Sequence, residues 1–106
     1  MTTKEIFDEM QRRMDADPAK LAGIKAVYQF DIEGADAGAY SVAIADEKAA
    51  VREGTDASPD ITLTIASNDF ADMVQGKLDG MTAFTLGKLK LKGDMLLAMK
   101  LQSLLK

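Results

Sequence analysis

The stretch Val27-Tyr28-Gln29-Phe30-Asp31-Ile32-Glu33 decides the fold class of this 106-residue chain. Its apolar and polar residues alternate, which is typical of a β-strand with one buried face. Residues 34–38 begin and end with glycine and predict a turn. Residues 40–46 repeat the alternation, and residues 48–53 can return as a third strand. We therefore expect an antiparallel meander.

Two further strands are predicted in the carboxyl half. Ile61, Leu63 and Ile65 alternate with threonines, after a loop at 54–59. Residues 88–93 read Lys-Leu-Lys-Leu-Lys-Gly, which predicts a strand with its leucines inward and its lysines outward. The expected sheet has five strands.

Helices are predicted before, between and after these strands. Helical spacing of apolar residues places them at about 3–15, 67–76, 79–87 and 94–105, with a short turn at 17–23. Thr2 and Glu5 have capping-box spacing, and Ser67 and Asp94 are expected N-caps. The order of elements predicts an α+β fold, in which helices cover one face of a mostly antiparallel sheet.

The composition excludes several kinds of site. The length predicts a single domain over 1–106, and the chain contains neither cysteine nor histidine. This absence excludes disulfides, zinc–thiolate sites, cysteine nucleophiles and histidine bases. No stretch resembles a secretory signal or is long enough to cross a membrane, so we expect a cytoplasmic protein.

The charge is unevenly distributed along the chain. Residues 1–76 hold 7 basic and 15 acidic side chains, whereas 77–106 hold 6 and 2. The overall charge of −4 argues against nucleic-acid binding. A basic, apolar carboxyl end predicts a contact surface there, and a solvated charge pattern is the alternative.

Motifs for catalysis are missing from the sequence. Gly80 lies seven residues before Gly87-Lys88, which breaks the spacing of a phosphate loop, and no Gly-x-Ser-x-Gly elbow is present. Asp15 and Asp17 begin like a calcium loop, but the later ligands are absent, so Asp17 fits a helix cap better. We expect no enzyme activity, no metal and no cofactor.

The last helix has more apolar surface than one interface needs. Its core-facing stripe is expected to be Leu97, Ala98, Leu101, Leu104 and Leu105. Met95, Leu96 and Met99 project elsewhere, and their cover can be the amino-terminal helix, a second subunit, a membrane or an apolar ligand. The seven methionines suit a cavity for variable apolar ligands, and plain core filling is the alternative.

The carboxyl third resembles a known family. Gly76-Lys77-Leu78, Ala83-Phe84 and the runs 87–95 and 97–102 are similar to the carboxyl-terminal signature of the sterol carrier protein type-2 domain. Residues 28–32 and 59–65 look like its first and fourth strands. The resemblance implies a five-stranded sheet whose covering helices enclose an apolar tunnel. That tunnel would bind sterols, fatty acids, acyl-CoA esters or other lipids.

The resemblance also implies site residues. The tunnel wall would contain Phe70, Met73, Val74, Met81, Phe84, Leu89, Leu91, Met95, Met99 and Leu101. Gln102 matches the glutamine of the family's Lys-Leu-Gln run and would meet a ligand's polar end. Asp79-Gly80 and Thr82 depart from the family pattern, which affects the tunnel's polar contacts. The final residues 104–106 are not a Ser-Lys-Leu-like tripeptide, so we expect a free-standing, bacterial member.

Two functions follow as expectations. The first is a lipid carrier with no chemistry of its own, either a monomer or a weak dimer. Lys88, Lys90 and Lys92 would dock it transiently on an anionic membrane, with a plain solvated sheet surface as the alternative reading. The second is an accessory module that presents lipid substrates to a lipid-metabolising enzyme or docks its last helix on a partner.

Overall fold

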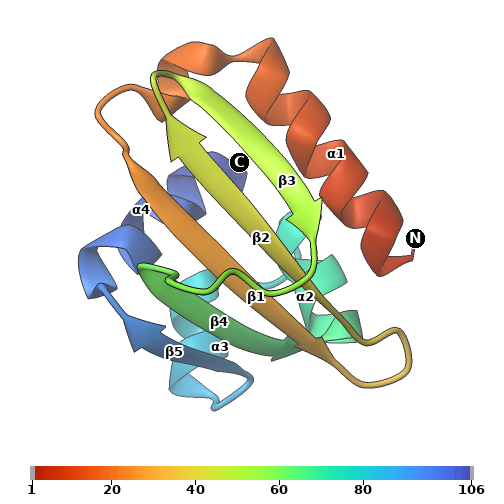
Figure 1. Ribbon diagram of the computed structural model, residues 1–106. Helices are drawn as coiled ribbons and strands as arrows, with labels where there is room; N and C mark the ends of the chain where they lie inside the picture. Colours follow the sequence, from red (N-terminus) through yellow and green to blue (C-terminus); the bar gives the residue numbers. More distant parts are fainter. Residues whose placement is uncertain (1, 106) are drawn as a thin grey trace.

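Five strands form one sheet in the computed structural model, which describes residues 2–105 apart from the side chains of Gln102 and Leu105. The strands are β1 (Ala26–Glu33), β2 (Gly38–Ala45), β3 (Lys48–Glu53), β4 (Ile61–Ala66) and β5 (Leu89–Gly93). Their order across the sheet is β3-β2-β1-β4-β5 (Figure 1). Only β1 and β4 are parallel neighbours, and the other three pairs are antiparallel. The predicted meander, the five strands and the mostly antiparallel sheet are confirmed.

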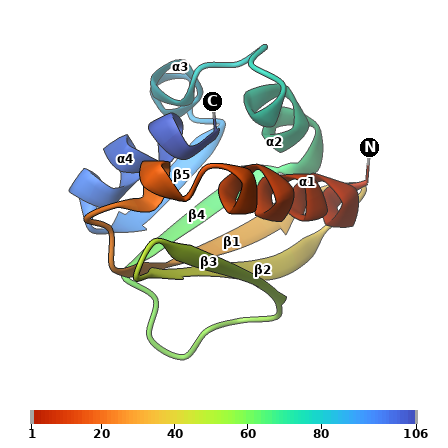
Figure 2. The same ribbon diagram turned by 90° about the horizontal axis from the view of Figure 1, so that it is seen from above.

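The helices lie on one face of this sheet. They are α1 (Thr3–Ala16), the short 3-10 helix η1 (Pro18–Leu21), α2 (Ser67–Val74), α3 (Gly80–Thr85) and α4 (Met95–Leu105). Figure 2 shows them together above the sheet, while the connection from β3 to β4 runs beneath it. The α+β architecture expected from the sequence is therefore confirmed.

Side-chain caps fix where most helices begin. Thr2 and Glu5 form the predicted capping box, and the Asp94 carboxylate accepts from the Leu96 amide at 2.9 Å. The prediction for Ser67 was wrong. Ala66 is the N-cap of α2 and provides no side-chain bond, while the Ser67 hydroxyl instead accepts from the Asp36 amide at 3.4 Å.

The core is filled by aromatic rings where α1 and α2 cover the sheet. Phe7 stacks on Tyr40 and Phe70 with ring centroids 4.2 and 5.1 Å apart, and it meets Phe30 edge to face. Such pairs add to the burial of large apolar area. The rings hold α1 and α2 on the sheet, whereas the region between α3, α4 and the sheet is lined mainly by leucines and methionines.

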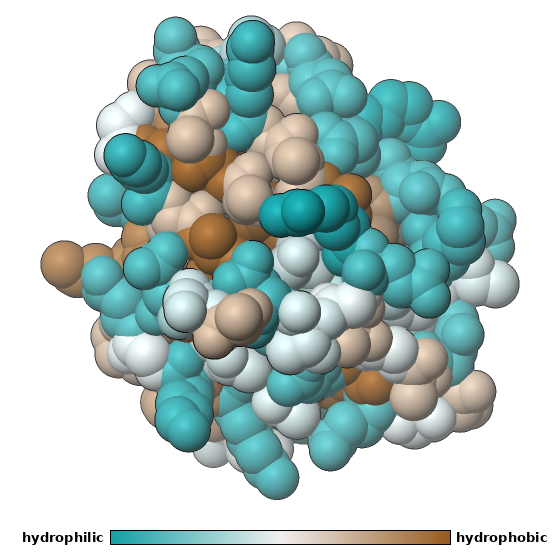
Figure 3. All heavy atoms as spheres, in the orientation of Figure 1, coloured by the Kyte–Doolittle hydropathy of each residue, from teal (hydrophilic) through white to brown (hydrophobic). Residues whose placement is uncertain are grey.

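The opposite face of the sheet carries the polar half of each strand. Figure 3 shows mostly hydrophilic and neutral side chains on this face, with a few hydrophobic patches. Gln29 is buried there beneath the β3–β4 connection, which it holds by accepting from the Asp56 amide at 2.8 Å and donating to the Gly54 carbonyl at 3.3 Å.

Candidate functional site

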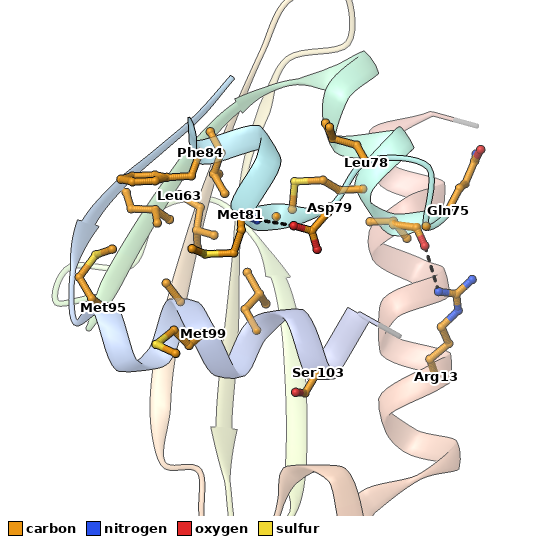
Figure 4. Close-up of a pocket in the computed structure, with 18 residues that line it drawn as sticks. Arg13, Leu63, Gln75, Leu78, Asp79, Met81, Phe84, Met95, Met99 and Ser103 are labelled. Carbon is orange, nitrogen blue, oxygen red and sulfur yellow. Dashed lines mark hydrogen bonds between the residues drawn. The ribbon is translucent and has the colours of Figure 1, made fainter. Parts of the chain in front are cut away.

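A cavity of about 790 Å³ lies between α3, α4 and the β4–β5 edge of the sheet. Figure 4 shows side chains from these elements converging on it, with the α2–α3 connection along its far side. Its floor comes from Leu63, Leu89 and Leu91. Because Leu63 pairs directly with Leu91 across the two strands, both side chains point to the same face. The alternation that makes the strands thus supplies an apolar floor.

Helix α4 forms one wall of the cavity. Ala98 and Leu101 turn toward the sheet, and Met95 and Met99 stand along the open side. The Tyr28 hydroxyl, on β1, donates to the Leu97 carbonyl at 2.9 Å and so ties this helix to the sheet. Burial, helped by the nearby carboxylates of Asp94 and Asp60, raises the pKa of Tyr28 to about 12. The phenol therefore stays protonated and able to donate.

The open side of the cavity is apolar and reaches solvent. Met81 is 62% exposed, Phe84 45%, Met95 48% and Met99 68%, and all four line the cavity. Exposed apolar side chains gathered around one cavity are typical of an entrance for an apolar ligand.

Polar lining residues gather away from the methionine-rich entrance. Figure 4 shows Arg13 and Gln75 on the side opposite Phe84 and Met95. Arg13, on α1, donates to the Val74 carbonyl at 3.4 Å and pairs with Glu9 at 3.0 Å. Among the lining residues that the structure describes, Arg13 is the only cation, while the Asp79 carboxylate is engaged in capping α3. The cavity therefore has one polar end, where the guanidinium of Arg13 lies, and one apolar end.

Most of the predicted tunnel residues lie together. The cavity is lined by Met73, Val74, Met81, Phe84, Leu89, Leu91, Met95, Met99 and Leu101. Phe70 is not among the lining residues, because its ring is packed between Phe7 and Phe30 in the core. The side chain of Gln102 lies outside the described residues.

Sequence reasoning missed half of the lining. The additional residues are Arg13, Leu63, Gln75, Gly76, Leu78, Asp79, Gly80, Ala98 and Ser103. Leu63 and Ala98 were predicted to face the core, so the strand alternation and the helical stripe that contain them already indicated their inward direction. Arg13 comes from the other end of the chain, and no local pattern indicated that α1 reaches this cavity.

The three lysines do not form the single row that was expected. Lys90 and Lys92 pair with Thr64 and Thr62, so their side chains share the sheet face opposite Leu63 and the cavity. Lys88 precedes β5, and its amine lies 3.7 Å from the carboxylate of Asp69 on α2. The prediction of one face for all three was wrong, because the strand begins one residue later.

Two other kinds of site are absent among residues 2–105. No group of three or more acidic side chains is placed to hold a metal ion within that range. None of the helices described there is long and apolar enough to cross a membrane.

Comparison with known sequences gives one family over nearly the whole chain. Residues 7–106 match the sequence model of the SCP-2 sterol transfer family. Sterol carrier protein 2 of Homo sapiens is 34% identical over 103 residues, which cover 93% of this chain and 19% of that protein. Hydroxysteroid dehydrogenase-like protein 2 of Xenopus laevis is 33% identical over 103 residues, covering 96% and 24%. The chain thus spans a quarter or less of these curated relatives.

Solved structures share the fold. Palmitated SCP2L2 from Aedes aegypti has a TM-score of 0.83 at 30% identity, over 99% of this chain and 95% of that one. The sec-alkylsulfatase Pisa1 from Pseudomonas also has a TM-score of 0.83, at 23% identity, over 99% of this chain and 16% of that one. The same sheet and helices therefore occur both as a small chain and inside a larger one.

Proposed function

Because the chain belongs to the SCP-2 sterol transfer family, we propose that it binds a long-chain fatty acid, or a lipid of similar shape, in the cavity and carries it without chemistry of its own. The observation that supports this proposal is the cavity of about 790 Å³, whose size falls in the range of ligand pockets. The Aedes aegypti relative, of similar length and fold, is palmitated in its solution structure.

The two ends of the cavity match the two ends of a fatty acid. The carboxylate would lie at Arg13, and the hydrocarbon chain would run between Met81 and Met99 toward Phe84. Burying sixteen methylenes at about 0.8 kcal/mol each gives about 13 kcal/mol, against an association cost of about 4–15 kcal/mol. Micromolar affinity is the expected result. The flexible methionines let the wall adapt to different chains, so we expect loose specificity that extends to sterols and acyl-CoA esters.

Native mass spectrometry of the freshly purified chain, followed by extraction of any bound lipid, tests this proposal. We expect one long-chain lipid per chain. Ala98→Trp would fill the cavity from α4 and abolish uptake of added hexadecanoic acid. Leu96→Trp, on the same helix but outside the lining, would keep it. Absence of bound lipid together with no uptake of fatty acid, acyl-CoA or sterol would reject the proposal.

A second function is supported by the length of the relatives. Hydroxysteroid dehydrogenase-like protein 2 is about four times as long as the matched segment, so related domains occur within larger proteins. In this reading the chain presents bound lipid to a separate lipid-metabolising enzyme. A dehydrogenase acting on an acyl or steroid substrate would then turn over protein-bound substrate faster than free substrate, and Ala98→Trp would remove the gain.

Docking on an anionic membrane is a further part of the proposed carrier function. Lys90 and Lys92 are exposed on the open sheet face, whereas Lys88 precedes β5 and is partly engaged by Asp69 on α2. At about 1 kcal/mol per lysine, replacing both with glutamine would weaken binding to phosphatidylserine vesicles about 30-fold. The matched control replaces Lys25 and Lys48, which are exposed elsewhere. Equal vesicle co-sedimentation of both double variants would reject membrane docking through Lys90 and Lys92.

The oligomeric state and location complete the proposal. We propose a monomer or weak dimer in the cytoplasm. Size-exclusion chromatography with light scattering, over a range of concentrations, tests the first part. A dimer that covers Leu96 and Met99 would favour an interface over a ligand entrance at these residues.

A further inference from the structure

One cavity holds the solvent-reachable thioethers among residues 2–105. Its wall includes Met73, Met81, Met95 and Met99, which come from three helices. Met81, Met95 and Met99 are 48–68% exposed, whereas Met10 and Met14 lie in the core at 5% each. Among the described residues, the methionines that a reagent can reach from solvent are therefore all cavity residues.

These thioethers lie where the middle of a bound chain would pass. Figure 4 shows Met81 and Met99 between the Arg13 side of the cavity and the Met95 side, on helices that face each other. A fatty acid with its carboxylate at Arg13 would place its middle carbons against these two sulfurs. A peroxide group in the middle of the chain would lie in the same region.

We propose that these methionines reduce a long-chain lipid hydroperoxide, held in the cavity, to the corresponding alcohol. This rests on the proposed function, because the peroxide must enter the same cavity as other lipids. It adds a reaction for peroxides alone to a carrier that leaves its other ligands unchanged. The thioether sulfur attacks the terminal peroxide oxygen, so that a sulfur–oxygen bond forms and the oxygen–oxygen bond breaks. Sulfur loses two electrons, the peroxide gains them, and the proton of the terminal oxygen passes to the departing alkoxide. The products are methionine sulfoxide and the lipid alcohol, one of each per thioether.

Binding gives this reaction its selectivity. A peroxide held against a sulfur reacts at a much higher effective concentration than one in solution. The product sulfoxide is polar, so it makes the wall less favourable for a hydrocarbon chain and promotes release of the alcohol. Sulfoxides are returned to thioethers by methionine sulfoxide reductases, which would make the cavity reusable.

A matched thioether outside the cavity tests the proposal. Leu96 and Met99 lie on the same helix and are both 68% exposed, but only Met99 lines the cavity. The L96M chain is treated separately with linoleic acid hydroperoxide and with hydrogen peroxide, and peptide mass spectrometry follows oxygen uptake at both positions. Hydrogen peroxide should oxidise both at similar rates. The lipid hydroperoxide should oxidise Met99 at least about tenfold faster than position 96, with an equal amount of alcohol formed.

Further measurements separate this inference from the carrier function. Preloading with hexadecanoic acid should suppress oxidation by the lipid hydroperoxide but not by hydrogen peroxide. The variant M81L/M95L/M99L, compared at equal amounts of bound peroxide, should yield at least about fourfold less alcohol per bound peroxide, because one of the four cavity thioethers remains. Equal oxidation of Met99 and position 96 by the lipid hydroperoxide, in a chain that binds hexadecanoic acid, would overturn the inference alone. A chain that does not bind the acid would overturn the carrier function as well.

Discussion

Replacing Arg13 with glutamine should weaken binding of a fatty acid without affecting a neutral lipid of the same length. Arg13 is the cationic lining residue, and its side chain is 41% exposed. A charge pair at about 4 Å is worth about 1 kcal/mol in water and about 4 kcal/mol at a partly buried site. The exposure places Arg13 near the lower figure. We therefore expect hexadecanoic acid to bind about 5- to 10-fold more weakly to R13Q.

The assay is isothermal titration calorimetry with hexadecanoic acid and with hexadecanol, which has the same chain and no charge. R12Q is the matched control, because Arg12 is adjacent, also contacts Glu9 and does not line the cavity. R13Q should lose affinity for the acid alone, and R12Q should resemble the parent chain. If R13Q loses as much affinity for the alcohol as for the acid, the substitution acts by removing the contact between α1 and α2. That result would refute the reasoning about the carboxylate.

Two further predictions concern stability. Gly93→Ala should lower the free energy of unfolding by about 2 kcal/mol or more, because Gly93 has φ of 123° and an added Cβ would overlap the Asp60 carbonyl oxygen. Gly54→Ala, with φ of 115° and open space around it, should cost less in the same urea titration. The folded-state pKa of Tyr28, about 12 against an ordinary value of 10.0, contributes stability that is complete below pH 10 and is lost as the pH rises through 12. This loss, about 2–3 kcal/mol, should be absent in Tyr28→Phe, and equal slopes for both chains in high-pH urea titrations would contradict it.

The strands and the family could be predicted from the sequence because both are encoded by residues that are close together in the chain. Period-two alternation is set by the pleat, so residues 27–33 and 88–93 indicated their own buried faces. The motifs at 76–102 indicated the SCP-2 family, which the match over 7–106 confirms. Ser67 was misplaced by one residue as a cap, which is the usual precision at a helix boundary.

The composition of the cavity was harder to predict, because it depends on which elements meet. Phe70 and Met73 lie on the same short helix, and both are buried and apolar. The positions of α1 and β1 decide that Phe70 joins the rings of Phe7 and Phe30, while Met73 faces the cavity. Arg13 is separated from the α2 carbonyl that it contacts by 61 residues, so its role comes from the fold alone.

The uneven packing of the two halves of the sheet is itself an argument for a ligand. The cavity of about 790 Å³ is open to solvent beside Met81 and Met99, which are 62% and 68% exposed, so it contains water whenever it contains no lipid. Water forms few favourable contacts with thioethers and leucines. A hydrocarbon chain that displaces this water buries its own apolar surface and that of the cavity wall, which favours binding. The aromatic half of the sheet and the Tyr28 bond to α4 hold the frame, so that the methionine half can stay open for that exchange.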